Sequence, residues 1–142
     1  MFYEGIGKLL AETATILAAG DSAADEKARR AQRGLTTLLR RVGAAWPGIL
    51  GALVEETAVF EATLERARAA ASRQGLEVPA EAASSDPLAH YGALQRELQA
   101  HILGFHAAGG SDASTEALRD IRRGMAEAAE IQGVVVEKML AS

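Results

Sequence analysis

The fold is decided by residues 24–74, ADEKARRAQRGLTTLLRRVGAAWPGILGALVEETAVFEATLERARAAASRQ, which carry the longest helical pattern in the chain. In the first half of this stretch, apolar residues fall within an arc of about 100° on a helical wheel, and arginines occupy the opposite side. The apolar set is Ala28, Ala31, Leu35, Leu38, Leu39 and Val42, and the basic set is Arg29, Arg30, Arg33, Arg40 and Arg41. This half therefore predicts an amphipathic helix.

The second half repeats the pattern beyond the sequence Trp46-Pro47-Gly48. Its apolar residues again share an arc of about 100°, with spacings that are mostly three and four. They are Ile49, Leu50, Leu53, Thr57, Phe60, Leu64, Ala67 and Ala71. Proline removes a backbone donor and disfavours helical dihedrals in the residue before it. The two arcs nevertheless have centres only about 20° apart on one continuous wheel. We therefore predict one long helix kinked at Pro47 rather than two helices joined by a turn.

A shorter helical pattern precedes this stretch, at residues 2–19. We expect Gly20 to end this first helix, because glycine is the usual residue just beyond a helix end. Asp21 or Ser22 then caps the long helix, since their side chains accept hydrogen bonds from the first free backbone amides. So short a connection predicts that the first and the long helix are antiparallel neighbours.

Two further helices are expected after the long one. Residues 75–87 are rich in helix breakers and small polar residues, which predicts a flexible linker. The next helix begins with Asp86 as its cap and Pro87 at its first position, and it ends at Gly109. A cap within residues 111–114 begins the last helix. The predicted fold is all-α, a bundle of four to five helices.

Composition agrees with one helical domain over residues 1–142. Alanine is the commonest residue, aromatic residues make up 4% and there are only three prolines, a mixture that favours helices over strands. The chain has no cysteine, which fits a reducing compartment. No apolar run approaches the ~18 residues of a membrane span, and the acidic N-terminal segment is a poor signal peptide. We expect a cytoplasmic protein that does not bind membranes.

Glu56, Glu97 and His101 are the candidate residues for a ligand or metal site. Glu97 and His101 lie four residues apart on one helix edge, which also predicts that their side chains form an intrahelical pair. If the helices on either side of the linker were antiparallel, Glu56 would lie at the level of His101. Carboxylate and imidazole groups together are suitable metal ligands. A Glu–His hydrogen bond at the edge of the core is the alternative interpretation of the same residues.

Several apolar residues are candidates for an interface between copies of the chain. Two helices alone cannot enclose the apolar faces of residues 2–19 and 26–47, and a large apolar surface is seldom left exposed on a monomer. The candidate residues are Phe2, Ile6, Leu9, Leu35, Leu39 and Trp46. Gln132 joins them because it lies near the centre of an apolar arc, where a neutral amide sets register or finds a local partner. We therefore predict a homodimer, the alternative being a hairpin that folds back on its own chain.

No group of residues supplies a nucleophile, a base and an oxyanion donor, so an enzyme is the less favoured interpretation. No cofactor is expected, although a bound metal ion is left open. The five arginines lack interleaved aromatic residues and adjoin Asp25 and Glu26, so nucleic acid is not expected as a partner. The sequence favours a non-enzymatic helical interaction module, such as an adaptor, an assembly factor or an export chaperone. The alternative is a ligand- or metal-binding bundle.

Overall fold

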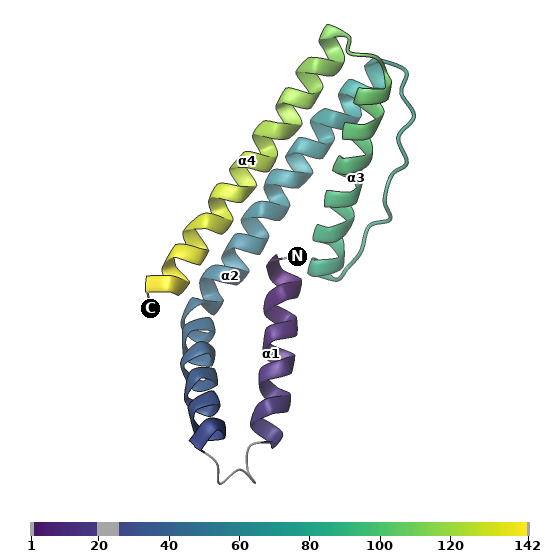
Figure 1. Cartoon of the computed structure of the whole chain (residues 1–142). Helices are drawn as coiled ribbons and strands as arrows, with labels where there is room; N and C mark the ends of the chain where they lie inside the picture. Colours follow the sequence, from purple (N-terminus) through teal and green to yellow (C-terminus); the bar gives the residue numbers. More distant parts are fainter. Residues whose placement is uncertain (1, 20–25, 142) are drawn as a thin grey trace. The chain divides into compact units, whose positions relative to one another are not determined.

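The computed structural model describes residues 2–19 and 26–141, which form four α-helices and no strand (Figure 1). These helices are α1 (Phe2–Ala19), α2 (Glu26–Arg73), α3 (Pro87–Ala107) and α4 (Asp112–Ala141). The all-α prediction is confirmed, with four helices among the described residues. The predicted helix end at Gly20 and the predicted cap at Asp21 or Ser22 lie outside the described residues. No described helix is both long and apolar enough to cross a membrane.

The ends of α3 and α4 follow from local chemistry. The Asp86 carboxylate accepts a hydrogen bond from the Ala89 amide at 2.9 Å, and Pro87 is the first helical residue, as predicted. After α3, Gly109 and Gly110 adopt φ angles of 85° and 73°, a conformation that side chains with a Cβ rarely tolerate. The residues that were predicted to cap or break these helices therefore lie at the observed helix ends.

One α-helix, α2, continues through Pro47, while the kink there stays a prediction. Contacts within the chain define two compact units. We call the first, Met1–Pro47 with Glu137–Ser142, the hairpin unit, and the second, Gly48–Val136, the bundle unit. Each unit is described separately.

In the bundle unit, the second half of α2 runs parallel to α3 and antiparallel to α4. Arg68 bonds to Glu97 and Glu61 to His90, so residue numbers rise together along α2 and α3. The antiparallel arrangement, which was the condition for Glu56 to lie at the level of His101, is therefore not found. Residues 74–86 run back along the outside of α3 instead of forming a short turn (Figure 1). Thirteen extended residues reach about 43 Å, which exceeds the roughly 31 Å length of a 21-residue helix.

Three helices enclose the core of the bundle unit. Its buried apolar side chains include Phe60, Leu64, Leu98, Phe105 and Ile121. Between α2 and α4 the backbones approach closely, because a Cβ on Gly124 would meet Oγ1, Cγ2 and Cβ of Thr63, the last at 3.0 Å. A side chain at position 124 would therefore displace Thr63.

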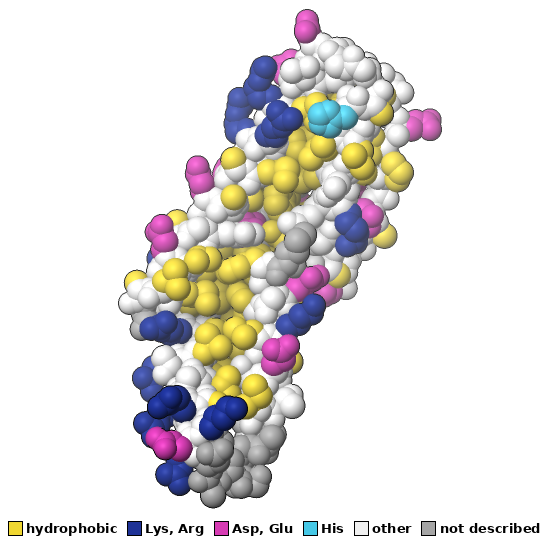
Figure 2. Space-filling model, in the orientation of Figure 1, with side chains coloured by type: hydrophobic (Ala, Val, Ile, Leu, Met, Phe, Trp, Pro, Cys, Tyr) yellow, Lys and Arg dark blue, Asp and Glu magenta, His cyan; other side chains and the backbone are white. Residues whose placement is uncertain are grey.

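The hairpin unit is built mainly from α1 and the first half of α2. Buried residues of this unit include Tyr3, Ile6, Thr13, Val42 and Ala45. Thr13 is the polar residue among them. Its hydroxyl donates a hydrogen bond to the Leu9 carbonyl at 2.6 Å, so this buried polar group has a partner. On the face shown in Figure 2, hydrophobic side chains gather between these two helices, and Lys and Arg side chains line the outer side of α2.

Candidate functional site

A buried carboxylate, Glu56, is the centre of the first polar network in the bundle unit. Its side chain is fully shielded from solvent on the core face of α2. The hydroxyl of Tyr91 on α3 donates to Glu56 Oε2 at 2.7 Å, and Nε2 of Gln132 on α4 donates to the same oxygen at 2.7 Å. Glu56 of α2 thus bonds to one side chain from α3 and one from α4, and these bonds hold the three helices in register.

Tyr91 connects the remaining amides of this network. Its hydroxyl accepts hydrogen bonds from Nε2 of Gln95 and Nε2 of Gln132, both at 3.3 Å. Burial raises the pKa of Tyr91 well above its ordinary value, and the hydrogen bond to Glu56 raises it further. The phenol therefore stays protonated at neutral pH and acts as a permanent donor to the carboxylate. This chemistry suits a structural role better than proton transfer near pH 7.

A second network surrounds Glu97, on the side of α3 that faces α2 and residues 74–86. Arg68 donates from Nε to Glu97 Oε1 at 2.6 Å and from NH2 to Oε2 at 2.8 Å, a bidentate pair. The Glu81 amide donates to Oε2 at 3.0 Å and so attaches the returning segment to α3. The Arg68 hydrogen bonds hold the pKa of the Glu97 carboxyl below its usual range, and the Glu81 amide contributes in the same direction.

His101 lies one turn after Glu97 and is almost completely buried. Its Nδ1 bonds to the backbone carbonyl of Glu97 at 2.9 Å, and because a carbonyl only accepts, Nδ1 carries the proton. The predicted side-chain pair between these two residues was wrong, since Arg68 takes the carboxylate instead. No described residue bonds to Nε2 of His101, and in the described part no fully buried side-chain nitrogen or oxygen lacks a partner. Nε2 therefore keeps contact with solvent.

An open hollow beside His101 provides that contact. It has a volume of about 280 Å³, and residues 76–80 of the returning segment form one of its walls. The polar groups that line it are Arg68, Ser72, Glu97 and His101. Both carboxylate oxygens of Glu97 are already bonded, so Nε2 of His101 and the Ser72 hydroxyl are the side-chain acceptors that the hollow offers to a small molecule.

The three predicted site residues do not meet at one point. Glu56 lies at the level of Tyr91, which is ten residues before His101 on α3 and so about 15 Å away along the helix axis. Across the described ranges, no group of three or more Asp, Glu or His side chains could hold a metal ion together. The parallel course of α2 and α3 is the reason, because it moves Glu56 away from the level of His101.

Sequence reasoning missed Tyr91 and Arg68, which complete the two networks. Tyr91 has the form of an ordinary apolar stripe residue, and Arg68 that of a surface arginine, so neither type indicated its role. Arg68 pairs with Glu97 across two helices, and spacing along the sequence carries no signal for a pair of this kind. Gln132 has its partners within the bundle unit, in agreement with the local-partner alternative.

The other interface candidates lie in the hairpin unit with differing exposure. Ile6 is buried, while Leu9 and Trp46 are 37% and 41% exposed. Ile16, a further apolar residue of α1, is 49% exposed. Phe2, Leu35 and Leu39 are half-buried. Apart from Ile6, these candidate residues are thus covered only in part.

Comparison with known proteins gives no relative from which a function could be transferred. No family model, no curated protein and no solved structure matches this chain.

Proposed function

We propose that this protein is a non-enzymatic helical interaction module whose hairpin unit associates with a second copy of the chain. The observation that carries this proposal is the incomplete burial of the apolar residues on α1 and the first half of α2. Leu9, Ile16 and Trp46 are between 37% and 49% exposed. Around them, five leucines are only half-buried: Leu10, Leu17, Leu35, Leu38 and Leu39. Apolar surface of this extent is normally covered by a partner.

The spacing on α1 suits a helical partner. Phe2, Leu9 and Ile16 recur every seven residues, and with Ile6 and Thr13 between them they give the alternating spacing of a coiled-coil seam. Ile6 and Thr13 are buried within the chain, whereas the seven-residue row is left partly open. Side chains in a row of this kind can pack as knobs into the holes between side chains of a neighbouring helix.

A second copy is a sufficient partner in size. A helix of 18 residues is about 27 Å long, and two such hairpins pairing into four helices bury ~800 Å² on each partner. A two-fold axis lets the same surface serve both chains, so that no further protein is required. Adaptor, assembly-factor and export-chaperone roles are all compatible with a dimer of this type, and the architecture does not choose among them.

Polar side chains of the bundle unit support a structural rather than a catalytic role. Glu56, Tyr91 and Gln132 bond to one another, and Glu97 bonds to Arg68. Among the described side chains there is no serine or threonine hydroxyl hydrogen-bonded to a histidine, the arrangement that activates a hydroxyl nucleophile. The networks therefore fix helix register, which is the established use of buried polar groups in helical assemblies.

Light scattering tests the proposal, with a mass of about 30 kDa expected, twice the 14.9 kDa of one chain. Replacing Leu9 and Ile16 together by asparagine should shift the mass to that of one chain. The matched control replaces Val54 and Leu103, apolar residues of the bundle unit that are 69% and 63% exposed, and should leave the mass unchanged. A mass near 15 kDa for the unaltered protein at high micromolar concentration would disprove the dimer and favour a hairpin that folds onto its own chain.

A ligand-binding function is the second candidate, and the hollow beside His101 is the observation that favours it. The site then comprises Glu97 and His101 with Arg68, without Glu56. Elemental analysis of the purified protein checks the metal form of this alternative. A stoichiometric transition metal would support it, and metal-free protein would leave only a small organic ligand to consider.

A further inference from the structure

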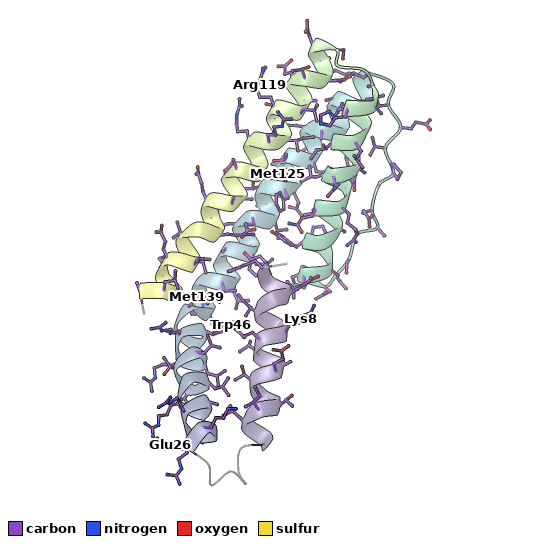
Figure 3. All side chains as sticks on the ribbon, in the orientation of Figure 1. Lys8, Glu26, Trp46, Arg119, Met125 and Met139 are labelled. Carbon is purple, nitrogen blue, oxygen red and sulfur yellow. The ribbon has the colours of Figure 1, made fainter. Side chains whose placement is uncertain are left out.

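The first half of α2 carries a strongly basic surface. Residues 27–54 contain six basic residues and no acid, although the whole chain has a net charge of −4. All five arginines of this segment are exposed: Arg29, Arg30, Arg33, Arg40 and Arg41. Glu26, the first residue of α2, is the only acid of this half, and it lies at one end of the arginine row (Figure 3). The charge is thus concentrated on one face about 18 Å long.

None of the five guanidinium groups forms an ion pair with a described residue, whereas Arg68, Arg96 and Arg123 do. The sequence alone disfavoured nucleic acid as a partner, because no aromatic residue is interleaved with these arginines to stack on bases. A row of five like charges that forms no ion pair with a described residue is unfavourable by itself, and an external polyanion would relieve the repulsion.

We propose that this face binds the sugar–phosphate backbone of double-helical nucleic acid without sequence specificity. An open hollow of about 470 Å³ lies on the face, lined by Arg29, Gln32, Arg33, Thr36, Thr37 and Arg40. Arginine, glutamine and threonine are typical phosphate-contacting side chains. A length of 18 Å corresponds to about five phosphates of one strand, equal to the number of arginines.

Other polyanions fit this face less well. Protein interfaces have an apolar centre, and the arginine arc contains no large apolar side chain, since the leucines lie on the opposite side of α2. The same separation keeps apolar groups from entering a lipid surface beside the arginines. Single-stranded nucleic acid is recognised by stacking on aromatic residues, and the arc has none. A duplex backbone requires only the charge and the hydrogen-bond donors that are present.

Fluorescence anisotropy with a labelled 20-base-pair DNA duplex tests the proposal. The logarithm of the binding constant should fall with the logarithm of salt concentration, with a slope of about −0.9 per phosphate contacted. The variant Arg29→Gln, Arg33→Gln, Arg40→Gln removes three contacts, so the slope should become less steep by about 2.7 and binding should weaken at least about tenfold at 50 mM salt. These side chains are exposed, and unchanged circular dichroism and urea midpoint would establish that the variant is folded.

The matched control is Arg73→Gln, Arg119→Gln, Arg122→Gln, which removes three exposed arginines of the bundle unit and changes the net charge equally. It should alter binding less than about threefold, because only distant charges are lost. An equal loss in both variants would show that net charge alone is sensed, and would overturn the proposal. Equally tight, arginine-dependent binding of poly-glutamate or of phosphatidylserine vesicles would also overturn it, as would absence of duplex binding at 50 mM salt. The test does not depend on whether the protein dimerises.

Discussion

The two units share one helix, α2, and yet they bury their apolar side chains to different degrees. In the bundle unit, the second half of α2 has two neighbours, α3 and α4, and its residues Phe60 and Leu64 are almost inaccessible. In the hairpin unit, most leucines on α1 and the first half of α2 are only half-buried. A continuous apolar stripe therefore specifies a helix in both places, and the number of neighbouring helices decides whether the stripe becomes a core.

Truncation of a core residue of the bundle unit should give the largest loss of stability. Phe105 is 1% exposed, and Phe105→Ala should lower the free energy of unfolding by about 3 to 5 kcal/mol, because apolar contacts are lost and a cavity remains. Urea denaturation measures this change. Leu103→Ala, on the exposed side of the same helix, should change stability by less than about 0.5 kcal/mol. Equal effects at both positions would contradict the description of Phe105 as core.

Filling the close contact between α2 and α4 should cost somewhat less. Gly124→Ala introduces a methyl group against Thr63, and overpacking of this kind costs about 1 to 3 kcal/mol. Thr63→Ala removes the two nearest atoms, Oγ1 and Cγ2, so the double variant should lose less stability than the sum of the single variants. A double-mutant cycle by urea denaturation measures this coupling. Strict additivity would show that the two residues do not meet.

Helix existence and helix ends were the parts of the fold that the sequence predicted well. Asp86 and Pro87 begin α3, and the glycines at 109 and 110 follow its end, because capping and left-handed backbone are local properties of one or two residues. The direction of α3 is not a local property. A linker of about thirteen residues is long enough either to turn or to return along a whole helix, and composition does not distinguish the two.

The candidate site depended on that direction. Glu97 and His101 lie on the core side of α3, as their helical spacing indicated, but their partners come from other helices. With α2 and α3 parallel, Glu97 meets Arg68, and Glu56 meets Tyr91 and Gln132. Long-range pairs of this kind follow from topology, so a cluster that depended on antiparallel helices placed Glu56 at the wrong level of the bundle.

Acid should weaken the bundle unit through Glu97. The Arg68 hydrogen bonds lower the pKa of this carboxyl in the folded state, so the pair stabilises the fold above the unfolded value of about 4.3. This stabilisation is lost as the pH falls through the folded pKa. Arg68 is half exposed, which limits the contribution to about 1 kcal/mol. Urea midpoints measured from pH 7 to pH 3 should fall less steeply for Arg68→Met than for the unaltered protein, and parallel curves would contradict the pairing.

Truncation in the hairpin unit should have the smallest effect on the folding of one chain and a clear effect on association. Ile16 is 49% exposed, so Ile16→Ala removes little buried surface and should lower the unfolding free energy of the monomer by less than about 1 kcal/mol. In the proposed dimer each of the two copies buries its own Ile16 in the interface. Ile16→Ala therefore removes two buried side chains and should weaken dimerisation at least about tenfold. Sedimentation equilibrium measures the change in dimerisation, and urea denaturation at low micromolar concentration measures the change in monomer stability.

Val54→Ala, a truncation at a position that is 69% exposed in the bundle unit, is the control and should change neither quantity. If Ile16→Ala instead lowered monomer stability by several kcal/mol without altering association, Ile16 would belong to a core within one chain, and the difference between the two units would disappear.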